Sequence, residues 1–143
     1  MPGKVLIIQE RNDCDFQTGF CTTPDDEGSR PGGELEILFS TDVILGKIDF
    51  FDSGHEEDGG NSNSEIHLFD SEGVEIHAGM FYVPFTGGDN MWDQLDFTSV
   101  SGVRRVIIEL NGSGAIDNLT YHIVPVPTAV WMFGSGLGLL GWL

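Results

Sequence analysis

Short extended segments separated by glycine clusters fill the first 124 residues and constrain the fold more than any other feature of the sequence. Apolar and polar residues alternate within these segments, which is the period-two pattern of β-strands. No stretch of this region repeats apolar residues at helical spacing over about three turns. The expected strands are Val5–Gln9, Glu34–Ser40, Val43–Asp52, Ser64–Asp70, Val74–His77, Met80–Phe85, Gln94–Phe97, Val103–Leu110 and Ala115–Val124. Short strands at this spacing predict an all-β domain, built as an antiparallel two-sheet sandwich.

One hairpin can be predicted with its register. Residues 71–73 separate two alternating segments, and a three-residue loop ending in glycine is a common hairpin closure. This register places Leu68 opposite Ile76 on the core face and His67 opposite His77 on the other face. Two facing imidazoles with glutamates nearby can hold a divalent transition metal. The alternative, which we favour, is that they simply belong to the solvated face of a sheet.

The chain is strongly acidic, with 23 Asp and Glu residues, 6 Lys and Arg residues and a formal net charge of -17. A protein without a basic stripe releases no counterions from a phosphate backbone, so we exclude nucleic acid and anionic lipid as electrostatic partners. Abundant carboxylates and few thiols favour hard cations, calcium above all. The alternative is that the acidity serves solubility alone.

The only two cysteines, Cys14 and Cys21, lie in one short polar stretch. A disulfide closing so small a loop suits an oxidising compartment and stabilises a protein by about 2–3 kcal/mol. The alternative is a pair of free surface thiols. We expect the disulfide, because the tail of the chain indicates export.

That tail begins after Val124, where the composition changes abruptly. Residues 125–143 carry no charge, and Pro125 and Pro127 end the last strand in an extended linker. From Ala129 onward the apolar run would form a helix of about 22 Å, shorter than the hydrocarbon core of roughly 30 Å. We therefore expect two parts, a β-sandwich domain over residues 1–124 and a short apolar helix of transmembrane type within the tail, 125–143.

The tail resembles the PEP-CTERM sorting signal in its Val-Pro-x-Pro variant. The residues that carry this resemblance are the proline motif and the apolar segment after it, namely Pro125, Val126, Pro127, Trp131, Phe133, Gly134, Ser135 and Gly136. In that family an exosortase, a membrane transpeptidase or protease of bacteria that make exopolysaccharide, recognises the signal. The resemblance implies an exported protein that is anchored in the inner membrane during sorting and then reaches the cell surface or the extracellular space.

Two features depart from the family pattern. Val126 stands where the family name has an acidic residue, which is a common variant, and the chain stops at Leu143 before the usual basic cluster. Positive charge normally holds that end in the cytoplasm. The N-terminal residues also run straight into a strand-like segment where a leader peptide would be expected. The missing basic cluster and the missing leader together lead us to expect a fragment of a longer protein.

The body of the chain resembles the extracellular domains that precede this signal, through residues 3–10, 24–33 and 112–119. The resemblance implies a jelly-roll sandwich like those of carbohydrate-binding modules. In such modules a structural calcium often links an N-terminal carboxylate loop to an aspartate on the last strand. The corresponding candidates here are Asp25, Asp26, Glu27 and Asp117. The alternative is a solvated turn at the first three positions and local backbone bonding at the fourth.

The sequence shows no nucleophile elbow, no suggestive Ser/His/Asp set and no metalloprotease motif, so we expect no enzyme. Two other functions remain. The first is a structural or adhesive component of the envelope and biofilm matrix that self-associates through sheet edges. The second is a calcium-stabilised carbohydrate-binding module for exopolysaccharide, with Tyr82 and Trp92 stacking on sugar rings. A core position for Trp92 is the alternative that we favour, so the first function is preferred.

Overall fold

The computed structural model describes residues 4–8, 14–21, 33–53, 64–87, 91–97, 100–112 and 114–124. Within these ranges the chain forms strands and no helix. The strands are β1 (Leu6–Ile7), β2 (Gly33–Leu45), β3 (Lys47–Phe51), β4 (Glu65–Phe69), β5 (Glu75–Tyr82), β6 (Trp92–Asp96), β7 (Ser101–Leu110), β8 (Ala115–Asp117) and β9 (Tyr121–Ile123). The prediction of an all-β domain is confirmed for this part of the chain, whereas the predicted helix of the tail lies outside it.

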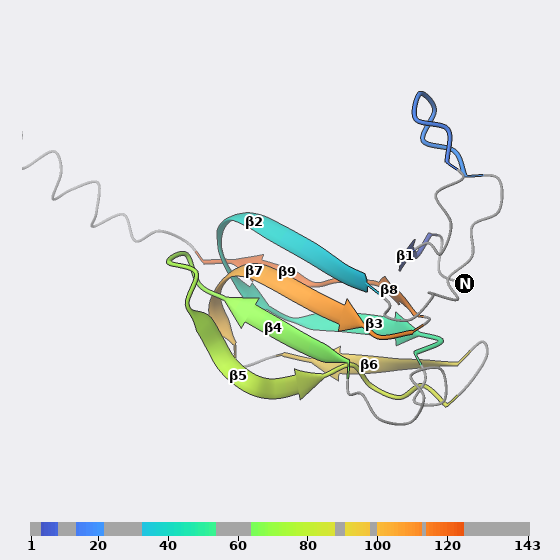
Figure 1. Ribbon diagram of the computed structural model, residues 1–143. Helices are drawn as coiled ribbons and strands as arrows, with labels where there is room; N and C mark the ends of the chain where they lie inside the picture. Colours follow the sequence, from blue (N-terminus) through green and yellow to red (C-terminus); the bar gives the residue numbers. More distant parts are fainter. Residues whose placement is uncertain are drawn as a thin grey trace, which may run out of the picture.

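The strands form two antiparallel sheets, which is consistent with a β-sandwich. One sheet has the strand order β1-β8-β3-β6 and the other the order β5-β4-β7-β2-β9. Figure 1 shows them as two layers, with β4 and β7 in the nearer layer and β3 and β6 behind. β6 and β5 are therefore edge strands, each at the end of its own sheet.

The core fills the space between the two layers. Alternate residues of the paired strands point inward, as the two-residue repeat of a strand requires. The buried cluster consists of Val43, Leu45, Ile48, Phe50, Ile66, Leu68, Phe97, Val100, Val103, Val106, Ile108, Leu110 and Ile116. Burying each of these side chains stabilises the fold by roughly 1.5–3 kcal/mol before entropy is counted.

The chain crosses from one sheet to the other at Gly46, between β2 and β3. The Gly46 N–H donates to the Thr120 carbonyl at 2.8 Å, and a Cβ at Gly46 would lie 2.5 Å from Thr120 Oγ1. The segment that contains Thr120 crosses between the sheets at the same place, from β8 to β9. For this reason two expected strands, 43–52 and 115–124, are each divided between the two sheets.

The predicted hairpin is confirmed at its closed end and wrong further along. Leu68 pairs with Ile76 as expected, and Gly73 has a φ of 78°. Beyond that pair the register shifts, so that Ile66 pairs with Phe81. The shift comes with His77 in the left-handed region at a φ of 55°. An irregular strand of this kind removes the predicted His67–His77 pair and merges two expected strands into β5.

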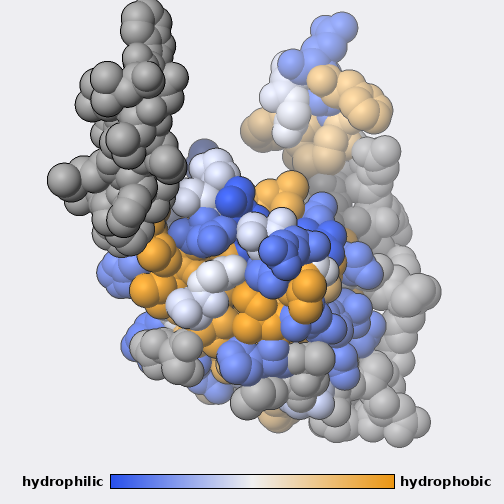
Figure 2. Space-filling view, turned by 90° about the vertical axis from the view of Figure 1, so that its left-hand side faces the viewer, coloured by the Kyte–Doolittle hydropathy of each residue, from blue (hydrophilic) through white to orange (hydrophobic). Residues whose placement is uncertain are grey.

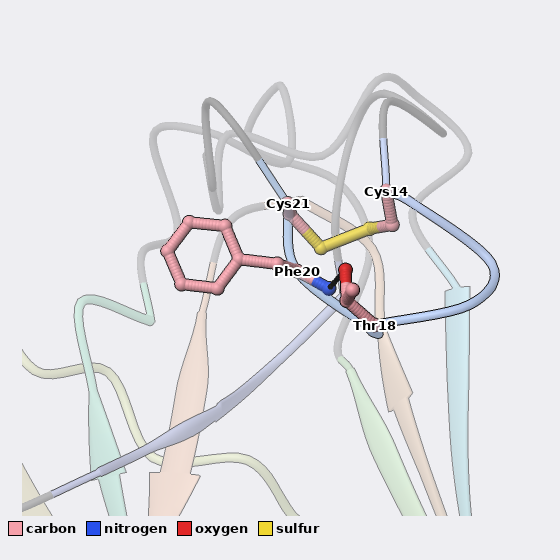
Figure 3. The surroundings of a disulfide bond; sticks show 4 residues. All are labelled: Cys14, Thr18, Phe20 and Cys21. Atoms are coloured by element: carbon pink, nitrogen blue, oxygen red, sulfur yellow. Dashed lines mark hydrogen bonds between the residues drawn. A yellow bond between two sulfur atoms is a disulfide. The ribbon is translucent and has the colours of Figure 1, made fainter.

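A disulfide joins Cys14 and Cys21, with an S–S distance of 2.04 Å, which confirms that prediction. Asp15 orders the loop between them, because its Oδ1 accepts the N–H groups of Gln17 at 2.7 Å and Thr18 at 2.9 Å. These two backbone bonds lower the pKa of the Asp15 carboxyl. Figure 3 shows the Phe20 ring turned away from the disulfide. The disulfide and the Asp15 hydrogen bonds, all within residues 14–21, therefore hold the loop.

Candidate functional site

The outer face of the four-stranded sheet carries polar and aromatic side chains in ordered rows. Ile48 and Phe50 of β3 point into the core, so the alternate residues of that strand point outward. Cross-strand pairing then sets their neighbours on β6 and β8. We call the resulting surface the four-strand face, and its residues are Lys47, Asp49, Phe51, Trp92, Gln94, Asp96, Asp117 and the adjoining Asn118.

The central row is built around the carboxylate of Asp49, which is only 7% exposed. Gln94 Nε2 donates to Asp49 Oδ1 at 2.7 Å, and Asn118 Nδ2 donates to Asp49 Oδ2 at 2.8 Å. Each carboxylate oxygen thus accepts a hydrogen bond from a neutral amide, which offsets the cost of burying the charge. These bonds also fix the orientation of both amides.

Asn118 reaches this position through an unusual backbone conformation. Its φ is 51°, in the left-handed region that asparagine tolerates better than most residues. Its backbone N–H donates to Asp117 Oδ1 at 2.7 Å, while its side chain donates to Asp49. Asp117 lies directly opposite Asp49 on the neighbouring strand, where two like charges are unfavourable. Asn118 therefore contributes a donor to each member of this carboxylate pair.

The next row along the strands is charged. Lys47 Nζ lies 3.6 Å from Asp96 Oδ2 and donates to Gln94 Oε1 at 3.0 Å. Both ionic side chains are 44% exposed, so their ion pair adds little to stability. The amide of Gln94 joins Lys47 to Asp49, and the two rows form one hydrogen-bonded network.

The third row is aromatic. Trp92 pairs with Phe51 across the two strands and is 59% exposed. The alternative of a core position for Trp92 is therefore wrong. A large exposed indole beside ordered polar groups is a surface that can accept the flat face of a ligand.

Tyr82, the other aromatic candidate, lies on the opposite side of the molecule. It is 43% exposed and pairs with Glu65 of β4, while its neighbour Phe81 packs inward against Phe97 with the ring centroids 4.9 Å apart. Tyr82 thus points outward from the five-stranded sheet. The structure does not bring Tyr82 and Trp92 together on one face.

A second polar cluster surrounds His67 on the five-stranded sheet. His67 Nδ1 lies 2.6 Å from Glu75 Oε1, and Nε2 lies 3.6 Å from Glu65 Oε2 and 3.5 Å from Glu109 Oε1. The hydrogen bond to Glu75 raises the pKa of His67, partial burial opposes that change, and the charges of the three glutamates reinforce it. Among the residues that the structure describes, no group of three or more His, Cys, Asp or Glu side chains is arranged to hold a metal ion.

This cluster predicts a pH-dependent contribution to stability. A pKa raised above the unfolded value of 6.5 means that the stabilisation is complete below pH 6.5 and disappears as the pH rises through the higher folded pKa. We expect about 1 kcal/mol or less, because the groups are partly exposed. Thermal unfolding between pH 5.5 and about pH 9 should show this loss in the native chain and not in His67→Gln. An equal loss in His67→Gln, with His122→Gln as the control, would contradict the assignment.

Apolar residues elsewhere on the surface are interspersed with hydrophilic ones on the side of the molecule seen in Figure 2. Leu38, Val74 and Ile123 are among the exposed apolar residues, with exposed fractions of 68%, 58% and 62%. Scattered apolar residues are normal for a protein surface. Self-association through sheet edges therefore remains a prediction.

The other sequence-based candidates lie outside the described residues. These are the sorting motif with its membrane segment (Pro125, Val126, Pro127, Trp131, Phe133, Gly134, Ser135 and Gly136) and three of the calcium candidates (Asp25, Asp26 and Glu27). The fourth calcium candidate, Asp117, belongs to the four-strand face. In the described part of the chain, no helix has the length and apolar character needed to cross a bilayer. Calcium binding and sorting both remain predictions.

Comparison with known proteins identifies no family. No family model matches the chain, and no curated protein matches it. A solved fucose-binding module from Streptococcus pneumoniae is similar with a TM-score of 0.42 and 19% identity, over 66% of this chain and 64% of that one. Another structure of such a module from the same species has a TM-score of 0.38 and 19% identity, over 65% of each chain. This chain thus spans slightly less than two thirds of either structure, and similarities this low define no function.

Proposed function

We propose that the four-strand face binds carbohydrate. The observation that carries this proposal is the exposed indole of Trp92 beside a row of polar side chains held by mutual hydrogen bonds. Sugars present apolar C–H faces, which stack on aromatic rings, and hydroxyl groups at their edges, which need oriented donors and acceptors. The four-strand face offers both kinds of contact in adjacent rows.

The spacing of the rows suits a linear glycan. Successive outward residues of one strand lie about 7 Å apart, since each residue advances the chain by roughly 3.4 Å. A sugar ring stacked on Trp92 would therefore bring hydroxyl groups close to Gln94 and Asp49. The row of Lys47 and Asp96 lies two rows, about 14 Å, from Trp92, so a ring further along the glycan would reach it. The proposed binding direction runs along β3 and β6.

The hydrogen-bond network prepares this face for binding. Each primary amide has two N–H donors, and one donor of Gln94 and one of Asn118 are used to hold Asp49. The second N–H of each amide can donate to a sugar hydroxyl. Because the side chains are already ordered, binding loses less rotamer entropy than it would with free side chains.

A glycan array probed with the full chain tests this proposal, and calorimetry on the positive glycans gives affinities. Gln94→Ala should lower the affinity about 2- to 10-fold, the value of one ordinary hydrogen bond, because it removes a donor and frees Asp49. Its free energy of unfolding should also fall, by about 1–3 kcal/mol, because the buried Asp49 carboxylate loses one of its two amide donors. A chain that binds no glycan at millimolar concentration would refute the proposal.

Export from the cytoplasm is the setting that we propose for this binding. The Cys14–Cys21 disulfide supports it, because disulfides persist in oxidising compartments. Sorting by an exosortase at the tail, and retention at the cell surface or in the exopolysaccharide matrix, are proposals of the same kind. They rest on the sequence resemblance of residues 125–143. A binding module in such a matrix would need no catalytic role.

A further inference from the structure

We infer that the four-strand face prefers glycans carrying protonated amines over neutral or acidic glycans. This inference rests on the proposed carbohydrate binding and assigns it a ligand class. Among the described residues of the face are one cationic side chain, Lys47, and three carboxylates, those of Asp49, Asp96 and Asp117. Their formal charge is therefore negative, in the same sense as the net charge of the whole chain.

The described cation of the face is already paired. Lys47 Nζ lies 3.0 Å from Gln94 Oε1 and 3.6 Å from Asp96 Oδ2. An acidic sugar would have to compete with Asp96 for this ammonium group while it approached two further carboxylates. Juxtaposed like charges disfavour such a complex.

The two arginines among the described residues belong to the other sheet. On its strand β7, Arg104 Nε lies 3.0 Å from Asp42 Oδ1 and Arg105 Nη1 lies 3.4 Å from Glu36 Oε1. The bidentate guanidinium contacts by which proteins commonly recognise carboxylate and sulfate are therefore absent from the described residues of the four-strand face.

Acceptors for an ammonium group are present on the same face as Trp92. Asp117 uses Oδ1 to accept the Asn118 N–H, and a carboxylate has about four acceptor sites in all. Asp117 lies one row from Trp92, and β3 separates its strand, β8, from the β6 strand of Trp92, so an amine on a neighbouring ring of the glycan would reach it. An indole also attracts cations through its ring face, most strongly among the aromatic side chains. Stacking and charge thus favour the same ligand, an amino sugar with free amines.

The test compares three oligosaccharides of equal length by calorimetry with the full chain at pH 5.5. They are the β-1,4-linked oligomers of glucosamine and of N-acetylglucosamine and the α-1,4-linked oligomer of galacturonic acid. Two exposed charge contacts predict about 3- to 10-fold tighter binding of the glucosamine oligomer than of its acetylated form. Galacturonate should bind most weakly, and the preference for glucosamine should shrink as salt screens the charges.

Two isosteric variants separate the charge effect from a loss of folding. Asp96→Asn and Asp117→Asn should bring the ratio of the affinities for the glucosamine and the acetylated oligomer close to one and leave the melting temperature nearly unchanged. Equal binding of the glucosamine and acetylated oligomers by the native chain would overturn the inference while carbohydrate binding itself stood. If none of the three oligosaccharides binds, the inferred preference for free amines is also wrong. The glycan array then shows separately whether the chain binds any carbohydrate.

Discussion

Replacing Trp92 by alanine is expected to lower the affinity for the bound glycan at least about 30-fold, the effect of losing an aromatic binding hot spot worth roughly 2 kcal/mol. The reason is that Trp92 supplies the one strongly exposed aromatic ring in the described part of the four-strand face. Calorimetric titration with a glycan found on the array measures the loss. The free energy of unfolding should change by about 0.5 kcal/mol or less, since 59% of this residue is in solvent.

Tyr82→Ala is the matched control for this experiment. It removes another exposed aromatic ring, 43% exposed, from an edge strand of the opposite sheet. We expect native affinity in Tyr82→Ala and partial affinity in Trp92→Phe, which keeps a smaller ring. A loss of binding in Tyr82→Ala with native binding in Trp92→Ala would place the site on the five-stranded sheet and refute the assignment.

Phe50→Ala should destabilise the domain by about 3–5 kcal/mol, because a buried phenylalanine leaves both lost apolar contacts and a cavity. Phe50 is fully buried, and its strand lies between β8 and β6 in the four-stranded sheet. Small domains are stable by only about 5–15 kcal/mol, so this loss takes a large fraction of the total. Urea unfolding followed by circular dichroism measures it as a lower midpoint at an unchanged slope.

The control is a phenylalanine-to-alanine substitution at a highly exposed position. Phe16 lies in the disulfide loop and is 93% exposed, so Phe16→Ala should change the free energy of unfolding by no more than about 0.5 kcal/mol. Similar unfolding midpoints for Phe50→Ala and the native chain would contradict the position of Phe50 in the core. Because Asp49 and Phe51 flank Phe50 on β3, Phe50→Ala should also weaken glycan binding.

Local chemistry made much of the fold predictable. Apolar alternation around Leu68 and Ile76 identified the closed end of a hairpin, and the glycine at position 73 identified its turn. The disulfide was predictable from two nearby cysteines together with the tail, which indicates export to an oxidising compartment. The expected pairing of His67 with His77 failed because the irregular strand after Ile76 changes the register, and nothing in the alternation signals that change.

The candidate site was much less predictable, because its parts are distant in sequence. Gln94 and Asn118 lie 45 and 69 residues from Asp49, which they hold. A signal was present locally: Asp49 lies between two apolar residues, Ile48 and Phe50, so its side chain had to point away from them. Which partners would meet it there depended on the pairing of β3 with β6 and β8.

The sequence by itself determined the all-β class, the disulfide and the residues of each strand that point to the same side, because these follow from alternation, turn chemistry and the two nearby cysteines together with the tail. Only the tertiary structure decided that Trp92 is exposed, that Tyr82 lies on the opposite face and that Asp49 lies between two amides. The physical reason is that the two-residue repeat of a strand is a local property of the backbone. Strand order, register and the crossing at Gly46 result instead from contacts between residues that are far apart in the chain.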